Sequence, residues 1–69
     1  MTEQESIERA RQHVEERGWP WREPVQATPV SWKGVGAYRI VTNVGRRGIN
    51  AAVIVASDGS ILHSEFMPR

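Results

Sequence analysis

The chain contains no cysteine, so disulfide cross-links and thiolate metal sites are both excluded. Its 69 residues are close to the smallest number that a single hydrophobic core can support. We therefore expect one domain, spanning residues 1–69, that is stabilised by the packing of its apolar side chains. A two-domain enzyme is excluded by length, and little chain remains for an active-site cleft.

Long apolar runs are also missing. The longest, Ala51–Ala56, is far shorter than the roughly 20 residues that a membrane-spanning helix needs. Residues 1–6 have neither the basic start nor the apolar run of a signal peptide. The sequence therefore predicts no membrane association and a cytoplasmic location.

Neither sign of charge dominates the chain, because nine Lys and Arg residues stand against eight Asp and Glu residues. The charges are unevenly placed: residues 1–17 contain five acidic and three basic side chains, whereas residues 18–69 contain three acidic and six basic ones. Nucleic-acid-binding domains usually carry a larger and more clustered basic excess. The charge pattern therefore argues against nucleic acid as a partner, although the basic residues 18–69 keep it as an alternative.

The first organised segment is predicted to be a helix from about residue 3 to residue 17. Thr2 and Glu5 have the spacing of a capping box, in which each side chain binds the other residue's backbone N–H. Gly18 provides the left-handed residue that commonly ends a helix, and Pro20 prevents its continuation. The apolar positions of this helix form one narrow stripe, made of Ile7, Ala10 and Val14.

The rest of the chain is rich in β-branched and aromatic residues, which favour strands. Four strands are predicted, at about residues 25–33, 37–44, 49–56 and 60–67. Pro29 lacks a backbone donor, so the first strand belongs at the edge of a sheet. Short connections favour a meander. The predicted fold class is α+β, with one N-terminal helix packed on an antiparallel sheet of three or four strands.

Asp58 and Gly59 have the composition of a two-residue hairpin turn, which determines how the last two strands pair. On one face we predict the pairs Val55 with Leu62, Val53 with Ser64, and Ala51 with Phe66. On the other face we predict Ala56 with Ile61, Ile54 with His63, and Ala52 with Glu65. The first set is the more apolar and is expected to face the helix, so Ile54, Ile61, His63 and Glu65 are expected to face outward.

Residues able to carry chemistry are few. His13 lies off the apolar line of the helix, and His63 shares a sheet face with Glu65, so this last pair has the composition of a proton relay or of half a metal site. A metal site needs at least three or four ligands, and no nucleophile elbow or phosphate-binding glycine loop is present. We therefore expect no enzyme activity, no cofactor and no metal.

The aromatic residues give the best indication of a binding surface. Trp19 follows the helix-ending glycine and is expected to pack back on the last turn. Trp21, between Pro20 and Arg22, is expected to stay partly exposed, as interface tryptophans do. The sequence therefore favours a small bacterial module that binds another protein without catalysis, through the candidate residues Trp21, Ile54, Ile61, His63 and Glu65. The alternative is a nucleic-acid-binding domain that uses Arg39, Arg46, Arg47 and the aromatic side chains.

The two expected edge strands raise the question of self-association. Pro29 weakens the first edge, so the strand at residues 60–67 is the more suitable contact. The chain is expected to be either a monomer or a weak symmetric dimer that uses this strand and its outward face.

Two segments carry a resemblance to known families. Tyr38–Val41 looks like the central strand, and Val53–Ile61 looks like the closing hairpin, of the PepSY family, whose members are small cystatin-like modules with one helix on an antiparallel meander. The same hairpin resembles that of short immunity proteins of bacterial toxin systems, some of them nuclear transport factor 2-like. Both resemblances imply a binding role, and neither supplies catalytic residues.

Overall fold

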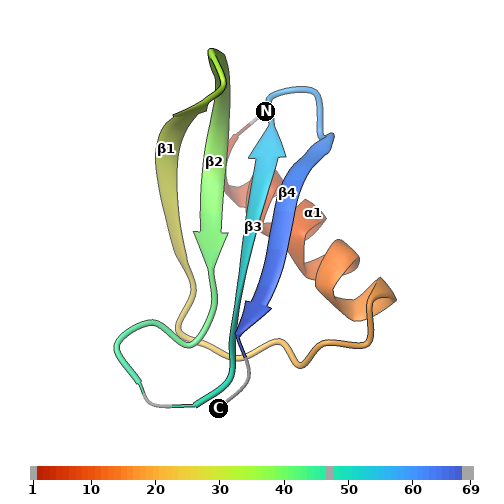
Figure 1. The fold of residues 1–69 in the computed structure, drawn as a ribbon, viewed down its shortest axis with the longest axis vertical. Helices are drawn as coiled ribbons and strands as arrows, with labels where there is room; N and C mark the ends of the chain where they lie inside the picture. The colour runs from red at the N-terminus through yellow and green to blue at the C-terminus, as the bar shows by residue number, and fades with distance from the viewer. Residues whose placement is uncertain (1, 47, 68–69) are drawn as a thin grey trace.

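The computed structural model describes residues 2–46 and 48–67. Within these residues a single helix is followed by four strands. Their bounds are α1 Glu3–Glu16, β1 Gln26–Trp32, β2 Val35–Val41, β3 Asn50–Ala56 and β4 Ile61–Met67. The strands form one antiparallel sheet in the order β1-β2-β3-β4, and α1 lies across one of its faces (Figure 1). The predicted α+β class and the meander are confirmed.

Both ends of α1 are closed as the sequence indicates. Thr2 and Glu5 form the capping box, with the Thr2 N–H donating to the Glu5 carboxylate over 2.8 Å and the Glu5 N–H donating to the Thr2 hydroxyl over 3.1 Å. At the other end Gly18 has a φ of 75°, and the Trp19 N–H donates to the Val14 carbonyl over 3.0 Å. This is the Schellman arrangement, and it directs Trp19 back against the core.

The core lies between α1 and the face of the sheet that the helix covers. Its fully buried members are Ala10 and Val14 from the helix and Ile40, Ala51, Val53 and Val55 from the sheet. Phe66 packs against this cluster, as predicted. The Trp19 ring stacks on the Phe66 ring, with 5.3 Å between the ring centroids. We call this the helix side of the sheet, and the opposite face the outer face.

The hairpin between β3 and β4 differs from the prediction. The Ala56 N–H donates to the Ser60 carbonyl and the Gly59 N–H donates to the Ala56 carbonyl, so the loop has three residues, of which only Gly59 has a positive φ. Val55 therefore pairs with Ile61 rather than with Leu62.

A β-bulge at Leu62 then restores the predicted register, because Ile54 pairs with His63 and Ala51 pairs with Phe66. The placement of two side chains was consequently wrong in the sequence analysis. Ile61 packs against the core on the helix side, and Leu62 is not part of the core cluster.

The loop between β1 and β2 is shorter than predicted. The predicted strand bounds left three residues, 34–36, between these strands. Lys33 and Gly34 both have a positive φ, of 50° and 83°, and Trp32 pairs with Val35. This is the geometry of a two-residue hairpin turn. β2 consequently starts at Val35 and ends at Val41, earlier at both ends than predicted.

In the part of the chain that the structure describes, α1 is the only helix, and it is too short and too polar to cross a membrane.

Candidate functional site

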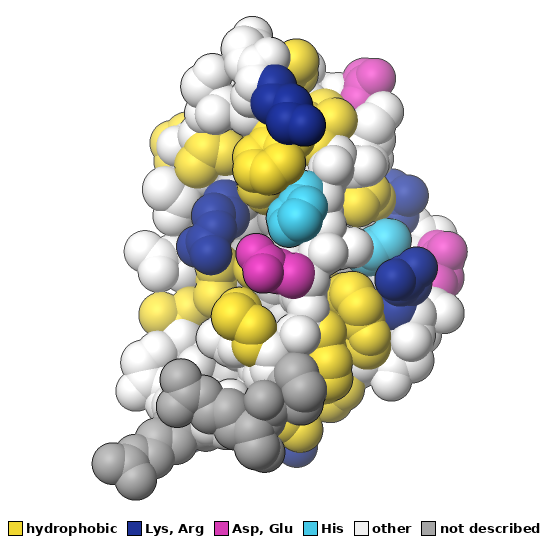
Figure 2. Space-filling model, in the orientation of Figure 1, with side chains coloured by type: hydrophobic (Ala, Val, Ile, Leu, Met, Phe, Trp, Pro, Cys, Tyr) yellow, Lys and Arg dark blue, Asp and Glu magenta, His cyan; other side chains and the backbone are white. Residues whose placement is uncertain are grey.

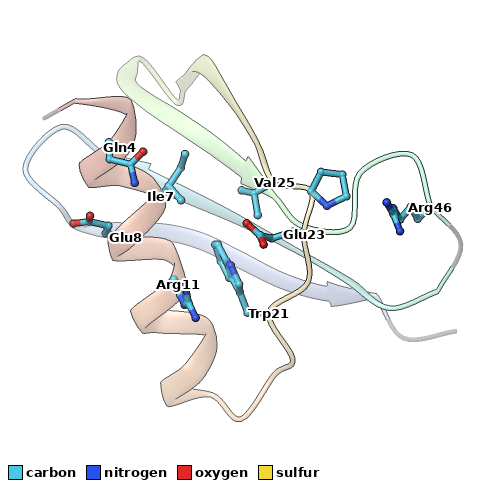
Figure 3. Close-up of a pocket in the computed structure, with 9 residues that line it drawn as sticks. Gln4, Ile7, Glu8, Arg11, Trp21, Glu23, Val25 and Arg46 are labelled. Atoms are coloured by element: carbon cyan, nitrogen blue, oxygen red, sulfur yellow. The ribbon is translucent and has the colours of Figure 1, made fainter.

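A groove runs between α1 and the connector that leads from the helix to β1. Its volume is about 750 Å³. The lining residues are Gln4, Ile7, Glu8 and Arg11 from α1, Trp21, Glu23, Pro24 and Val25 from the connector, and Arg46 from the loop after β2. We call it the Trp21 groove, because the Trp21 ring stands in its middle, between the helix and the connector (Figure 3).

The apolar floor of the Trp21 groove is continuous with the core. Ile7, Trp21 and Val25 are half-buried, and each packs against the core cluster. Two backbone hydrogen bonds hold the connector to the loop after β2: the Asn43 N–H donates to the Arg22 carbonyl over 2.8 Å, and the Val44 N–H donates to the Pro24 carbonyl over 3.1 Å. The groove is therefore built on fixed backbone.

The rim of the Trp21 groove carries both signs of charge. The Arg11 guanidinium lies 6.0 Å from the centre of the Trp21 ring, at the outer limit of a cation–π contact. Glu23 lies on the other side of the ring, and Glu8 and Arg46 complete the charged lining (Figure 3). Two carboxylates and two guanidiniums leave the rim formally neutral.

The outer face of the sheet carries a second group of candidate residues. The Trp32 ring of β1 stacks on the His63 ring of β4, with 5.1 Å between the centroids and 28° between the planes. Lys33 lies 5.8 Å from the centre of the Trp32 ring, and His63 Nε2 lies 3.5 Å from Glu65 Oε1. This face is turned to the viewer in Figure 2, where histidine, acidic, basic and apolar side chains adjoin one another.

The contact between Trp32 and His63 joins the two edge strands across the sheet. His63 is also the partner of Ile54 in the sheet, and Ile54 is only 6% exposed. Ala52, which pairs with Glu65 on the same face, is also buried. The apolar side chains of the outer face, Ile54 and Ala52, are thus shielded from solvent within the sheet itself.

The five residues predicted as a protein-binding surface do not come together. Trp21 lines its groove beside α1, whereas His63 and Glu65 lie next to each other on the outer face. Ile54 is buried beneath the outer face, and Ile61 packs in the core on the helix side. The apolar outward surface that Ile54 and Ile61 were expected to offer for self-association is therefore not formed.

The arginines of the nucleic-acid alternative are separated as well. Arg39 is paired opposite Ile54 and belongs to the outer face, whereas Arg46 lines the Trp21 groove beside the helix. Arg47 lies outside the described residues. Arg39 and Arg46 therefore do not share one cationic surface.

The structure also shows a pair that sequence reasoning missed. His13 Nε2 lies 3.0 Å from the Ser64 Oγ, and the His13 ring meets the Trp19 ring edge to face, with 6.1 Å between the centroids. Burial, together with the charges of Arg17 and Arg9, lowers the pKa of His13 below its ordinary value of 6.5. The imidazole is therefore neutral at pH 7.

A serine and a histidine in contact have the composition of a nucleophile and its base. Among the residues that the structure describes, no side chain hydrogen bonds to the second ring nitrogen of His13, as the orienting group of a catalytic dyad would. No sequence signal linked these two positions, which are 51 residues apart. We interpret the pair as a contact that fixes α1 against β4.

Within residues 2–46 and 48–67, no three histidine or acidic side chains converge on a possible metal position. Comparison of the chain with protein-family models, with curated proteins and with solved structures gives no match. The function is therefore argued from the surfaces described above.

Proposed function

We propose that this protein is a non-enzymatic module that binds a segment of another protein in the Trp21 groove. The observation that carries the proposal is the placement of Trp21, whose half-buried ring packs against the core while it also lines the groove. A tryptophan held in this way presents a large apolar surface at little conformational cost, which is why tryptophan is enriched at binding hot spots.

The composition of the groove supports a particular kind of segment. Its centre, with Trp21, Ile7 and Val25, suits an apolar or aromatic anchor side chain. Its rim pairs carboxylates with guanidiniums, so it suits a segment with charges of both signs on either side of that anchor. A polyanion such as nucleic acid gains little from a rim of no net charge.

Selection from a random peptide library displayed on phage tests the proposal directly. We expect enriched peptides to bind the purified domain, and Trp21→Ala to weaken that binding by about tenfold or more. The matched control is Trp32→Ala, which removes a half-buried tryptophan from the outer face. Failure to enrich any peptide, or equal losses for the two variants in folded protein, would contradict the proposal.

The nucleic-acid alternative has its own test. Phosphate contacts weaken steeply as salt concentration rises, so a nucleic-acid-binding domain is retained on heparin or single-stranded DNA at low salt. We expect no such retention. The resemblance to PepSY modules and to bacterial immunity proteins is part of the same proposal, since both imply a binding role for a helix on a meander.

A further inference from the structure

Helix α1 forms one wall of the Trp21 groove. Its four lining residues are Gln4, Ile7, Glu8 and Arg11. Their spacing of three and four places these side chains on one face of the helix. The face extends for about 10 Å along the helix axis, which is roughly two helical turns. The groove therefore offers a partner contact along two turns of α1.

No strand of the described sheet lines the groove. Its other wall is the connector, whose last lining residue, Val25, precedes the start of β1 at Gln26. The backbone groups in the middle of α1 bond within the helix, and the carbonyls of Arg22 and Pro24 already accept from the loop after β2. An extended segment in the groove would therefore find no sheet edge to pair with its own N–H and C=O groups. Strand addition is not available at this site.

A proline-rich segment does not suit the groove either. Such segments leave their backbone to solvent and dock in grooves lined with aromatic rings. Trp21 is the one aromatic side chain among the lining residues that the structure describes. A helix satisfies its backbone internally and needs only an apolar strip to cover its own apolar face. Ile7, Trp21 and Val25 supply that strip, since all three line the groove and are only half-buried.

The rim is formally neutral, but its charges are not equally free. Glu8 on the α1 wall and Glu23 on the connector wall are exposed, and within the described residues neither carboxylate forms an ion pair or accepts a hydrogen bond. Arg11 Nε, by contrast, lies 3.8 Å from Oε1 of Glu15, which does not line the groove. Arg46 lies on the side of the connector away from α1 (Figure 3). The unpaired charge beside the apolar strip is therefore acidic.

We propose that the segment bound in the Trp21 groove is an amphipathic helix of the partner protein, which covers Trp21 with its apolar face and directs a lysine or arginine toward Glu8 and Glu23. Apolar anchors at a spacing of three and four supply the affinity. The cation selects among such helices, because it meets carboxylates that no described residue neutralises. This inference rests on the proposed function, since it names the kind of segment that the same groove binds.

The test uses three blocked synthetic peptides and NMR titration of the labelled domain. The first peptide carries leucines at positions i, i+3, i+4 and i+7 of an alanine-rich helix, with lysines on both sides of that apolar face. The second has one central alanine replaced by proline, which breaks the helix. The third has the lysines replaced by glutamates. We expect the first peptide to shift the Trp21 indole signal and to bind about tenfold more tightly than the second and about fivefold more tightly than the third.

Charge reversal in the domain makes the outcome specific. Glu8→Lys should weaken binding of the lysine peptide by about fivefold and strengthen binding of the glutamate peptide. The matched control is Glu16→Lys, which makes the same change on α1 outside the groove and should alter both affinities by less than about twofold. Both glutamates are exposed, so both variants should fold as the parent does.

Failure of this inference and failure of the proposed function give different results. If peptides selected on phage bind through Trp21, the groove stands as a binding site. The helix inference is then overturned if the proline peptide binds as well as the helical one, or if Glu8→Lys has no more effect than Glu16→Lys. If no peptide shifts the Trp21 signal, both proposals are overturned. A Trp21 signal that shifts with protein concentration in the absence of peptide would also overturn the helix inference, because that result assigns the groove to a second copy of the chain.

Discussion

Apolar side chains are buried on both faces of the sheet, but different elements cover them. On the helix side, Ala10 and Val14 of α1 cover Ile40, Val53 and Val55, which is the ordinary packing of a helix on a sheet. The described residues provide no second helix for the outer face, where the Trp32 side chain of one edge strand instead meets His63 of the other. A short chain with one helix can cover a second apolar face only with side chains that the sheet itself supplies.

The largest effect should come from the helix side. Ile40 is 1% exposed, and Ile40→Ala should lower the free energy of unfolding by about 2–5 kcal/mol, because it leaves a cavity that a small core cannot fill. Urea denaturation measures the loss. Val35→Ala, at a position that is 45% exposed, is the control and should change stability by less than about 0.5 kcal/mol.

A smaller loss is expected on the outer face. Trp32→Ala removes the ring that stacks on His63, the residue opposite Ile54, and should lower the free energy of unfolding by about 1–3 kcal/mol, from lost apolar burial and the lost ring stack. The same urea titration measures it. A variant as stable as the parent would show that the outer face does not depend on its aromatic cover.

Closure of the helix side also depends on how α1 ends. Gly18 has a φ of 75°, which an alanine adopts at a cost, so Gly18→Ala should destabilise the protein by about 1 kcal/mol in thermal unfolding. Gly36→Ala is the matched control, because Gly36 has no positive φ and its missing Cβ would meet open space. Comparable shifts in Tm for both variants would argue against a role for the left-handed cap.

The smallest effect should be a pH dependence of the contact between α1 and β4. The pKa of His13 is lower in the folded protein than its ordinary value of 6.5, so the folded state resists protonation there. The contribution of neutral His13 to the free energy of unfolding is fully present above about pH 6.5 and is lost as the pH falls through the folded-state pKa of His13. Denaturation at pH 7 and pH 5 should therefore show a larger decrease for the parent than for His13→Gln, and equal decreases would exclude this role of His13.

Local signals in the sequence predicted the helix side well. The capping box at Thr2 and Glu5, the stop at Gly18 and the packing of Trp19 were all correct, because each depends on residues within one or two turns of the chain. The edge position of β1 also followed from one residue, Pro29. The partial exposure of Trp21 also followed from a neighbouring residue, since Pro20 beside it forbids regular helix, but no sequence signal indicated the groove.

The closing hairpin shows where local reasoning ends. Asp58 and Gly59 fit both a two-residue and a three-residue loop, and the choice moves the pairing of Ile61 and Leu62 by one residue. Side-chain packing on two faces decides between these loops, and that information is not local. The prediction that Ile61 faces outward was wrong for this reason.

The sequence by itself determined the α+β class, the order of the elements, the ends of the helix and the apolar core residues of α1 and β3, because periodicity, caps and turn residues act over a few neighbouring positions. Only the tertiary structure brought Trp32 to His63, His13 to Ser64 and the connector to α1. These contacts join residues far apart in the chain, and their geometry depends on how the sheet curves and where the helix crosses it.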